Sequence, residues 1–477
     1  MRLDTRSHSR RSTALAVMWL LIATLLGLGC TGSPEGLAVE ASCEGCNVLF
    51  ISIDTLRADH LGAYGYGRET SPAIDALAAQ SVVFENAYST SYHTADSHMS
   101  MFTSLYPSVH GVRNSKGKTG QVLSSSVSTL PEILQANGYA TAGFHGGGNV
   151  SGFYGFARGF EKYRRTDEVE EAIDWIRETP ERPFFAFVHT YHVHDPYTPQ
   201  PPYDTLFAED YQGPISSDRE SLLGRTDGET FNELRDVFWS QVDPTRSEDI
   251  EHLKALYDGQ IREIDARVGE LIRAALEADE RTVIVLVSDH GEEFYEHGKF
   301  LHDQLYEELL RVPLILRLPS GAKGRIEERV SLIDLAPTLL DVIGLEAPNQ
   351  FQGSSLVPVL KGVEGRPLVY GEKVVQLSED DGETELGGQG IRAALISDDW
   401  KVIAARTEEL YYLPDDLQEQ NNLASQSPEM SGLLELLADV NRRNAALRKE
   451  LGTGLGDKQG LDEETLEELE ALGYLGN

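Results

Sequence analysis

Residues 93–107, HTADSHMSMFTSLYP, place a hydroxyl, a carboxylate and an imidazole within about one helical turn of one another. Thr94, Asp96 and His98 precede an apolar pattern with helical spacing, which predicts that Thr94 lies at or just before a helix N-terminus. The free N–H groups of a helix N-terminus favour an anionic ligand. A metal-bound threonine hydroxyl can become an alkoxide nucleophile, whereas threonine alone commonly caps a helix. This stretch alone leaves both roles open.

Two acidic residues elsewhere end apolar runs. Asp54 closes NVLFISID, and Asp289 closes TVIVLVSD and is followed by His290. Buried parallel strands read as continuous apolar runs, and ligand sites collect beyond their carboxyl ends. We therefore expect Asp54, Asp289, His290 and Thr94 to converge on one divalent cation. A ligand set of mixed oxygen and nitrogen atoms suits calcium, magnesium, manganese or zinc, although a single strand-end aspartate would more simply cap a turn.

Several other polar residues are candidates for acting on a substrate. Imidazoles can steady a tetrahedral anion or protonate a leaving oxygen, which makes His98, His194 and His302 candidate catalytic groups. Any one of them could equally be a structural histidine. The candidate substrate-binding residues are Asp96, His145, His297 and Lys299.

The order of the elements predicts an α/β fold. Apolar runs at 47–54, 182–189 and 282–289 alternate with helical patterns, as in a doubly wound sheet. The helical patterns cover residues 71–84, 129–139, 167–179 and 249–278. Short alternating segments at 391–406 and 408–414 predict a smaller antiparallel sheet, followed by a helical, acidic tail from residue 428. The acidic residues 203–250 predict a surface excursion near the mouth of the site.

Charge limits the partners of this 477-residue chain. It has 77 acidic and 41 basic side chains, a net charge of −36. Such a surface repels nucleic acid and anionic lipid headgroups. A small anionic ester could therefore bind only where a metal ion or clustered donors offset the field.

The N-terminus predicts export. Arginines precede an apolar run at 14–28, and the pattern predicts a signal peptide over residues 1–30. Cys30 follows small residues as in a bacterial lipoprotein signal, although Gly27 is atypical; ordinary cleavage or an uncleaved anchor are the alternatives. We expect a tether over residues 31–46, and a location in the cell envelope, the periplasm or outside the cell. Membrane contact is expected only through this segment.

Only two other cysteines exist, Cys43 and Cys46, in SCEGC. In an oxidising compartment they could form a small disulfide loop.

Taken together, these segments resemble the sulfatase family of the alkaline-phosphatase superfamily. The resemblance rests on an ordered set of motifs that runs from about residue 47 to the end and is weak over 203–250: NVLFISIDTLRADHLGAYGY, FTSLYPSVHGV, VSDHGEEFYEHG, LYEELLRVPLILR, SLIDLAPTLLDVIG, FQGSSLVPVL, ELYYLPDDLQEQNNLA and LEALGYLG. It implies an alkaline-phosphatase-like doubly wound mixed sheet flanked by helices. It also implies a catalytic domain over residues 47–375 and an antiparallel-sheet subdomain with a helical tail over 376–477.

The resemblance also assigns roles to the candidate residues. It implies one divalent metal ion, calcium above the other candidates, with Asp54, Asp289 and His290 at ligand positions and Thr94 at the nucleophile position. His98 stands where many members have arginine. His194 matches a substrate-contacting histidine, and His302 matches a position usually filled by lysine or histidine.

The chain departs from the family pattern at its signature. Sulfate-ester hydrolases of the family typically show C-x-P-x-R and oxidise its cysteine to formylglycine, but here the five places read Thr-Ala-Asp-Ser-His. Because position 94 has no cysteine to oxidise, we do not expect formylglycine chemistry. Thr55 stands where many members have a second metal-binding aspartate, and GYATAGFHGGG lacks the lysine of the arylsulfatase motif G-K-W-H-L-G. The threonine resembles a formylglycine-independent subgroup and relatives that transfer phosphoryl groups.

These observations predict an exported, metal-dependent hydrolase of sulfate, phosphate or phosphonate esters. Two alternatives remain: a transferase that passes the group to a cell-envelope alcohol, and a catalytically inactive binding protein with the same fold.

Overall fold

The computed structural model describes most of the chain from residue 42 onward. The described residues are 42–114, 119–166, 168–178, 182–208, 210–225, 231–375, 390–453, 458–463, 465–466 and 469. They all belong to one unit, residues 37–477. The predicted signal peptide with Cys30, most of the predicted tether and residues 470–477 lie outside the described residues.

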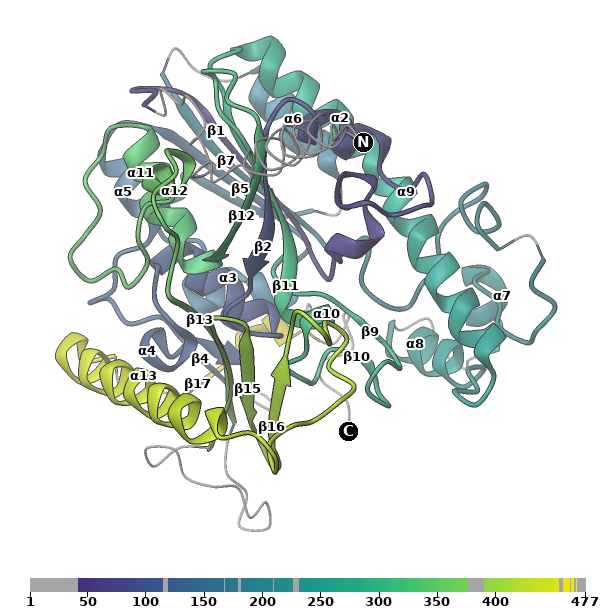
Figure 1. Ribbon diagram of the computed structural model, residues 1–477. Helices are drawn as coiled ribbons and strands as arrows, with labels where there is room; N and C mark the ends of the chain where they lie inside the picture. Colours follow the sequence, from purple (N-terminus) through teal and green to yellow (C-terminus); the bar gives the residue numbers. More distant parts are fainter. Residues whose placement is uncertain are drawn as a thin grey trace, which may run out of the picture. The chain divides into compact units, whose positions relative to one another are not determined.

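The main sheet has eight strands and is mixed, as the sequence predicts (Figure 1). Seven strands run parallel and one, β11, runs antiparallel to its neighbours β2 and β8. The three predicted apolar strands form its centre, in the order β8, β1, β7. From edge to edge the strands are β12 (Gly324–Ser331), β2 (Val82–Tyr88), β11 (Arg311–Arg317), β8 (Val283–Val287), β1 (Val48–Ile53), β7 (Phe184–Thr190), β5 (Ala140–His145) and β6 (Lys162–Arg165).

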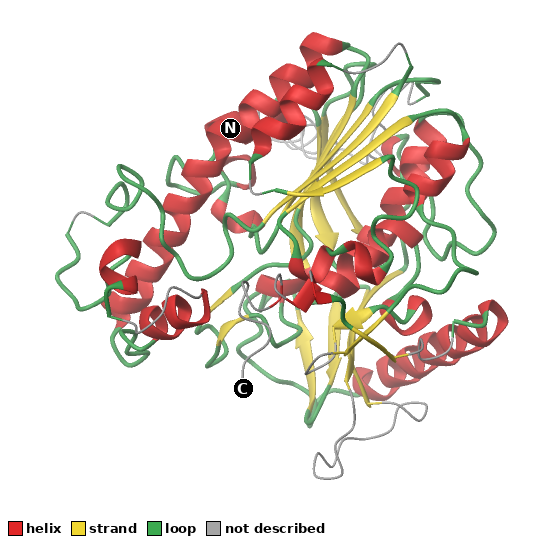
Figure 2. Ribbon diagram, turned by 180° about the vertical axis from the view of Figure 1, so that it is seen from behind, coloured by secondary structure: helices red, strands yellow, loops and turns green. Residues whose placement is uncertain are grey.

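Helices cover both faces of this sheet (Figure 2). Alternate residues of a strand point to opposite faces, so Phe50 of β1 joins one hydrophobic core and Ile51 joins the other. The face of Ile51 is covered by α2 (Pro72–Ala78), α6 (Val169–Arg177) and the long α9 (Ser247–Ala278). The face of Phe50 is covered by α3 (Thr94–Thr103), α5 (Leu130–Ala136), α11 (Leu335–Val342) and α12 (Val357–Leu360). Burial on both faces explains why the central strands show no polar alternation.

A second, four-stranded antiparallel sheet follows, as predicted. Its strands are β13 (Leu368–Val375), β14 (Gly390–Ser397), β15 (Trp400–Ala404) and β16 (Glu408–Tyr412), and α13 (Glu429–Leu451) packs against β14 and β15. A third hydrophobic core joins Tyr88 and Tyr92 of the main domain to Ile396 and Ile403 of the second sheet. The sheet therefore packs directly on the segment that leads to Thr94. The predicted domain boundary at residue 376 stays a prediction.

The helix predicted over residues 71–84 is only partly correct. Helix α2 ends at Ala78, and residues 82–88 form β2, which lies between β11 and β12. The residues Val82, Val83 and Phe84 are all buried in the sheet. A short apolar run after a helix has no periodicity that separates helix from strand, and the long-range pairing with β11 decides it.

The acidic excursion over residues 203–250 contains the short helices α7 (Arg219–Leu223) and α8 (Phe231–Trp239). Helix α8 lies beside the hairpin of β9 (Glu293–Phe294) and β10 (Phe300–Leu301), where the rings of Trp239 and Phe300 are 5.3 Å apart (Figure 1).

A disulfide lies near the start of the described chain. Cys43 and Cys46 form a disulfide, and the Cys43 amide donates to the Val342 carbonyl at 2.5 Å.

None of the helices in the described parts of the chain has the length and hydropathy that a bilayer span requires.

A buried lysine ties the second sheet to the main domain. Lys401 on β15 is fully buried, and its Nζ lies 3.0 Å from Glu307 Oε1 and 2.8 Å from Glu419 Oε1. We expect Lys401→Met to lower the free energy of unfolding by about 3–5 kcal/mol, because it leaves two buried carboxylates without their cation. Urea unfolding of both proteins measures this change.

The matched control is Lys254→Met, which removes the surface pair of Lys254 and Glu251. This variant should change the free energy of unfolding by less than about 1 kcal/mol. Equal effects of the two substitutions would contradict a stabilising role for the buried triad.

Candidate active site

The carboxyl ends of the central strands bring three of the four predicted metal ligands together. β1 pairs in parallel with β8, with Ser52 opposite Val287, so Asp54 and the Asp289–His290 pair follow neighbouring strands at the same edge. Asp54, Asp289 and His290 each offer a ligand atom within 4.8 Å of the other two. All three side chains are fully buried. This spacing suits ligands that share one divalent cation.

Four buried atoms of the predicted ligands have no hydrogen-bond partner within the described structure. They are Asp54 Oδ1, Thr94 Oγ1, Asp289 Oδ2 and His290 Nε2, one from each predicted ligand. Buried polar atoms are nearly always paired, so four unpaired ones among the residues predicted to share a cation are consistent with an external partner. The donor set of carboxylate, hydroxyl and imidazole atoms fits a divalent metal ion.

The imidazole of His290 is oriented for this role by the backbone. Its Nδ1 lies 2.9 Å from the Gly291 carbonyl, which can only accept a hydrogen bond. Nδ1 therefore carries the proton and Nε2 presents a lone pair. Metal-binding histidines commonly have this arrangement, in which a backbone carbonyl fixes the tautomer.

Thr94 is the first residue of α3, and its hydroxyl does not cap the helix. The N-cap is His93, which makes no side-chain capping bond. The Thr94 hydroxyl is buried and unpaired, as described above. The first turn is held against the metal-site residues, because Ser97 Oγ donates to the Asp289 carbonyl at 2.8 Å.

His98 holds this turn in place rather than facing open space. Its Nδ1 donates to the Thr94 carbonyl at 2.9 Å and its Nε2 accepts from Ser52 Oγ at 2.8 Å. Nδ1 also lies 3.5 Å from Asp289 Oδ2. Burial, and next the nearby His189, lower the pKa of His98 to about 3, so the ring is neutral. The catalytic role predicted for His98 is not tested by these contacts, but both ring nitrogens already have partners.

The negative charges of the Asp54 and Asp289 carboxylates repel each other. Burial, and next the charge of Asp54, raise the pKa of Asp289 well above its usual range. Burial acts the same way on Asp54, but the hydrogen bond from His189 and the charges of His290 and His194 outweigh it and lower the pKa of Asp54. Two adjacent buried carboxylates ionise together only when a cation balances them. A divalent cation at this position would allow both to be charged.

His194 lies in a polar network that the sequence did not reveal. Its Nδ1 lies 3.2 Å from Asp195 Oδ1. Asp195 Oδ2 in turn accepts from Arg235 Nε at 2.6 Å and from Trp239 Nε1 at 2.8 Å, both on α8. Burial lowers the pKa of His194, but the charge of Asp195, followed by those of Asp54 and Glu292, outweighs it and raises the pKa above its ordinary value. The excursion thus reaches the site through α8, which holds Asp195, and the charge of Asp195 favours a protonated His194.

His302 occupies the space between His194 and His290. The ring centroid of His302 lies 5.2 Å from that of His194 and 4.6 Å from that of His290. His302 Nδ1 lies 3.0 Å from Glu292 Oε1. Burial raises the pKa of Glu292 to about 8, whereas burial and the neighbouring histidines lower the pKa of His302 well below its ordinary value. The pair therefore carries its proton on the carboxyl group near neutral pH.

The four candidate substrate-binding residues have different surroundings. Asp96 is buried, and its Oδ2 lies 2.8 Å from Lys373 Nζ on β13. His145 stacks on Tyr163 with ring centroids 4.2 Å apart. The ligand atoms of His297, Glu308 and Glu419 lie within 4.8 Å of one another and form a second group of possible ligands. Lys299 lies 3.2 Å from the exposed Asp303. Their roles in substrate binding stay predictions.

Thr55 and His189 are two further residues at the strand ends. The Thr55 hydroxyl donates to the Asp54 carbonyl at 2.8 Å, so this residue does not replace a carboxylate ligand. His189 Nε2 lies 3.3 Å from Asp54 Oδ2. The sequence prediction missed His189, although it ends the apolar run RPFFAFVH just as Asp54 and Asp289 end theirs.

Comparison with known proteins decides the family. The sulfatase family model matches residues 46–345, and a model of the C-terminal region of N-sulphoglucosamine sulphohydrolase matches residues 295–445. The chain belongs to the sulfatase family. It is accordingly a hydrolase of the class that acts on sulfate or phosphate esters.

Individual sulfatase relatives align over nearly the whole chain. Arylsulfatase K of Homo sapiens is 23% identical over 88% of this chain and 87% of its own length. The N-acetylglucosamine-6-O-sulfatase of Bacteroides thetaiotaomicron is 25% identical over 83% of this chain and 86% of its own length.

Solved structures show the same sulfatase fold. The phosphonate monoester hydrolase of Agrobacterium radiobacter has a TM-score of 0.68 at 21% identity, covering 84% of this chain and 96% of that one. A structure in complex with its substrate D-glucosamine-2-N,6-O-disulfate has a TM-score of 0.69 at 20% identity, covering 85% and 99%.

The charge of Asp195 should control the protonation of His194. We expect Asp195→Asn to lower the pKa of His194 below its ordinary value, because burial then outweighs the remaining attraction. The NMR titration of the histidine ring protons measures this pKa, with His194→Gln to assign the resonance. Asp174→Asn on the exposed side of α6 is the control and should leave the titration unchanged; an unchanged His194 pKa in Asp195→Asn would contradict the electrostatic coupling.

Proposed function

We propose that this sulfatase-family protein hydrolyses sulfate, phosphate or phosphonate esters through Thr94 as the nucleophile, with one bound divalent cation. The observation that carries the proposal is the set of four buried, unpaired atoms from Asp54, Thr94, Asp289 and His290. The threonine hydroxyl belongs to this set, so the group that would attack is itself a candidate metal ligand.

The cation would be held by the side chains that end β1 and β8. A divalent cation bound there supplies positive charge that lowers the pKa of the threonine hydroxyl and offsets the charge of the ester oxygens. The N-terminus of α3 adds N–H groups that favour an anion at the same place. His98 and Ser97 hold the first turn of α3 against Asp289, which keeps the hydroxyl in position.

The reaction would proceed in two displacements. Thr94 loses its hydroxyl proton to solvent and Oγ bonds to the sulfur or phosphorus atom, while the bond from that atom to the leaving oxygen breaks. The protonated His194 donates a proton to the leaving oxygen, which departs as an alcohol. Water then attacks the sulfur or phosphorus atom of the threonine ester, and the bond from that atom to Thr94 Oγ breaks. One proton of the water passes to His194 and the other to Thr94 Oγ, so sulfate, phosphate or phosphonate is released and both residues regain their protons. His302 lies between His194 and His290 and can contact the same oxygens.

The choice of ester follows from position 94 and from the relatives. Threonine cannot be oxidised to formylglycine, and a metal-bound threonine is suited to phosphoryl groups. The similar structures include a phosphonate monoester hydrolase as well as a protein with a sulfated sugar substrate. We therefore propose an ester with an anionic sulfate, phosphate or phosphonate group and an organic alcohol as the leaving group.

We also propose that the protein is exported and anchored by lipid at Cys30. The charged and apolar pattern of residues 1–30 supports export. The Cys43–Cys46 disulfide supports an oxidising compartment, because disulfides rarely persist in the cytosol.

Metal removal provides the first test. We expect one divalent ion per chain in elemental analysis of the reconstituted protein, and loss of that ion in Asp54→Asn and Asp289→Asn. At a cation concentration about 100 times its Kd, binding should stabilise the fold by about 2.7 kcal/mol, which chelation removes. Thermal unfolding with and without chelator measures this. Asp174→Asn is the exposed control, and a full metal content in both ligand variants would refute the site.

Replacement of the nucleophile provides the second test. We expect Thr94→Ala to lower kcat by at least about a thousandfold on whichever of an aryl sulfate, a phosphate monoester, a phosphate diester and a phosphonate the wild type cleaves fastest, because the attacking oxygen is lost. Thr94→Ser keeps a hydroxyl and should retain measurable turnover. Near-normal rates in a folded Thr94→Ala protein would show that another group attacks.

A further inference from the structure

The second group of possible metal ligands lies outside the candidate active site. It consists of His297, Glu308 and Glu419. His297 is in the turn between β9 and β10, Glu308 is on the short helix α10 (Glu307–Leu310), and Glu419 is between β16 and α13. Their side chains are 9%, 7% and 0% exposed. Three separate parts of the chain therefore bring an imidazole and two carboxylates together away from water.

The imidazole of His297 presents a lone pair to this group. Burial lowers the pKa of His297, so the ring is neutral near pH 7. A hydrogen bond to the Gln418 backbone raises this pKa in opposition, so the backbone group is the carbonyl and it accepts from a ring N–H. Because His297 Nε2 has no hydrogen-bond partner in the described structure, the proton is on Nδ1 and Nε2 is the free base. Tyr306 stacks on the ring, with centroids 3.5 Å apart, and fixes its plane.

The distance between His297 and Glu308 suits two ligands of one ion. His297 Nε2 lies 3.4 Å from Glu308 Oε1, and both atoms are buried without a hydrogen-bond partner in the described part of the chain. This separation is long for a hydrogen bond between them. Two ligand atoms that each lie about 2.1 Å from a tetrahedral zinc ion are about 3.4 Å apart.

Glu419 supplies the third ligand atom. Its Oε2 accepts from the Glu307 amide at 2.6 Å, which fixes the carboxylate on the backbone of α10. Its Oε1 contacts Lys401 Nζ at 2.8 Å. A carboxylate oxygen has two lone pairs, so Glu419 Oε1 can contact Lys401 and an ion together.

The surroundings of this group have a surplus of negative charge. Glu307, Glu308 and Glu419 are three nearly buried carboxylates, and Lys401 contacts Glu307 and Glu419. Three acids and one lysine leave two negative charges, which one divalent cation would balance. Burial raises the pKa of Glu308 to about 7 and that of Glu419 to about 8. Protons therefore balance part of the charge until a cation replaces them.

A further cation acts on Glu308 but does not remove this surplus. The charge of Arg57 lowers the pKa of Glu308 against the larger effect of burial. The Arg57 guanidinium is already paired with Asp59 at 2.8 Å and with Glu296 at 2.7 Å. Its charge is therefore matched before Glu308 is counted.

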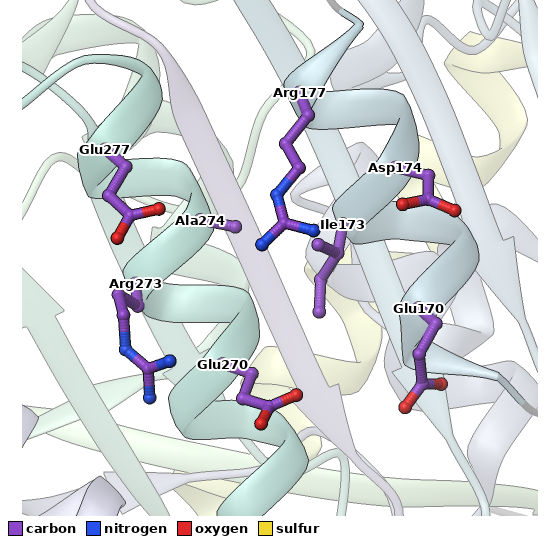
Figure 3. A pocket seen from close by; sticks show the side chains of 8 residues that line it. All are labelled: Glu170, Ile173, Asp174, Arg177, Glu270, Arg273, Ala274 and Glu277. Atoms are coloured by element: carbon purple, nitrogen blue, oxygen red, sulfur yellow. The ribbon is translucent and has the colours of Figure 1, made fainter.

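Another acidic cluster shows why burial matters. Between α6 and the last turns of α9, charged side chains line a pocket of about 250 Å³ (Figure 3). All six of these side chains are exposed, and none is a histidine. Water and the two arginines already satisfy such acids, so this pocket has no unmet need for a metal ion. Its charged residues are Glu170, Asp174, Arg177, Glu270, Arg273 and Glu277.

We propose that the second ligand group binds one zinc ion through His297, Glu308 and Glu419, and that this ion ties the β9–β10 hairpin to the second sheet. Imidazole nitrogen and carboxylate oxygen are ordinary zinc ligands, and water can take the fourth tetrahedral position. Calcium prefers six or more oxygen ligands. Reconstitution with calcium therefore fills only the candidate active site, and this zinc ion is additional to the ion expected there.

The ion would act on the segment that leads to the candidate active site. His302 directly follows β10, so the hairpin that carries His297 also sets the position of this candidate catalytic residue. Gln420 Nε2 donates to the Glu296 carbonyl at 3.5 Å, so the hairpin already meets the segment of Glu419. A shared ion would add a stronger link between the same two segments.

Zinc binding to the metal-stripped full-length protein tests the site. The proteins are wild type, Glu308→Gln, His297→Gln and the matched control Glu270→Gln, which removes an exposed acid from the pocket of Figure 3. At zinc concentrations that saturate wild type, we expect each ligand variant to bind one zinc ion fewer per chain and the control to bind as many as wild type. Elemental analysis after equilibrium dialysis counts the ions, and two ligand variants keep the test decisive if one does not fold.

Anomalous diffraction from wild-type crystals soaked in zinc locates the ion. We expect a peak among His297, Glu308 and Glu419. Peaks only elsewhere, or equal zinc contents in wild type and the folded ligand variants, would overturn the proposal. Because the variants are compared with wild type, the outcome does not depend on ester cleavage or on the metal content of the candidate active site.

Hydrogen exchange tests the tie between the two segments. Zinc should slow amide exchange in residues 293–301 of wild type by about fivefold or more, and it should have no such effect in Glu308→Gln. The candidate active site is unchanged in this variant, so the difference reports on the second ligand group. Zinc that binds among these three residues without slowing exchange in the hairpin would refute the tie.

Discussion

The candidate active site is organised around four buried polar atoms that have no hydrogen-bond partner in the described part of the chain. Groups that could have paired with them are engaged elsewhere: Ser97 bonds the Asp289 carbonyl, His98 bonds Ser52 and Thr94's backbone, and the Thr55 hydroxyl bonds the Asp54 carbonyl. Leaving buried polar atoms unpaired costs about 1–3 kcal/mol each, more for charged groups. Such a cost persists in a fold when an external cation supplies the missing interactions.

Much of this site could be predicted because strand ends are local features. Asp54 and Asp289 each follow a continuous apolar run, and parallel neighbours must bring these ends to one edge. His189 ends the apolar run of β7 in the same way, but the sequence prediction did not include it. By contrast, the hydrogen bonds from Arg235 and Trp239 to Asp195 join segments 40 or more residues apart, and nothing in the local sequence pattern indicates them.

The fold could be predicted where local patterns decide it. The prediction failed where pairing between distant segments decides it. The central strands and the antiparallel second sheet follow from local patterns, whereas the segment from Val82 onward continues an apolar helical pattern and is nevertheless a strand. Its state depends on β11 and β12, which lie more than 200 residues later in the chain. Helix α8 was likewise not predicted, because the acidic composition of its segment indicated only a surface excursion.

Charge gives the second sheet a role beside the candidate active site. An enzyme with a net charge of −36 must present cations where its anionic substrate binds. Buried acidic residues already pair with basic side chains near the candidate site. Asp96 holds Lys373 near the proposed nucleophile Thr94, and Asp195 holds Arg235 beside His194. One of these two cations comes from the second sheet and the other from the excursion. Both additions to the α/β core therefore supply positive charge that the strand ends, which carry the acids, cannot provide.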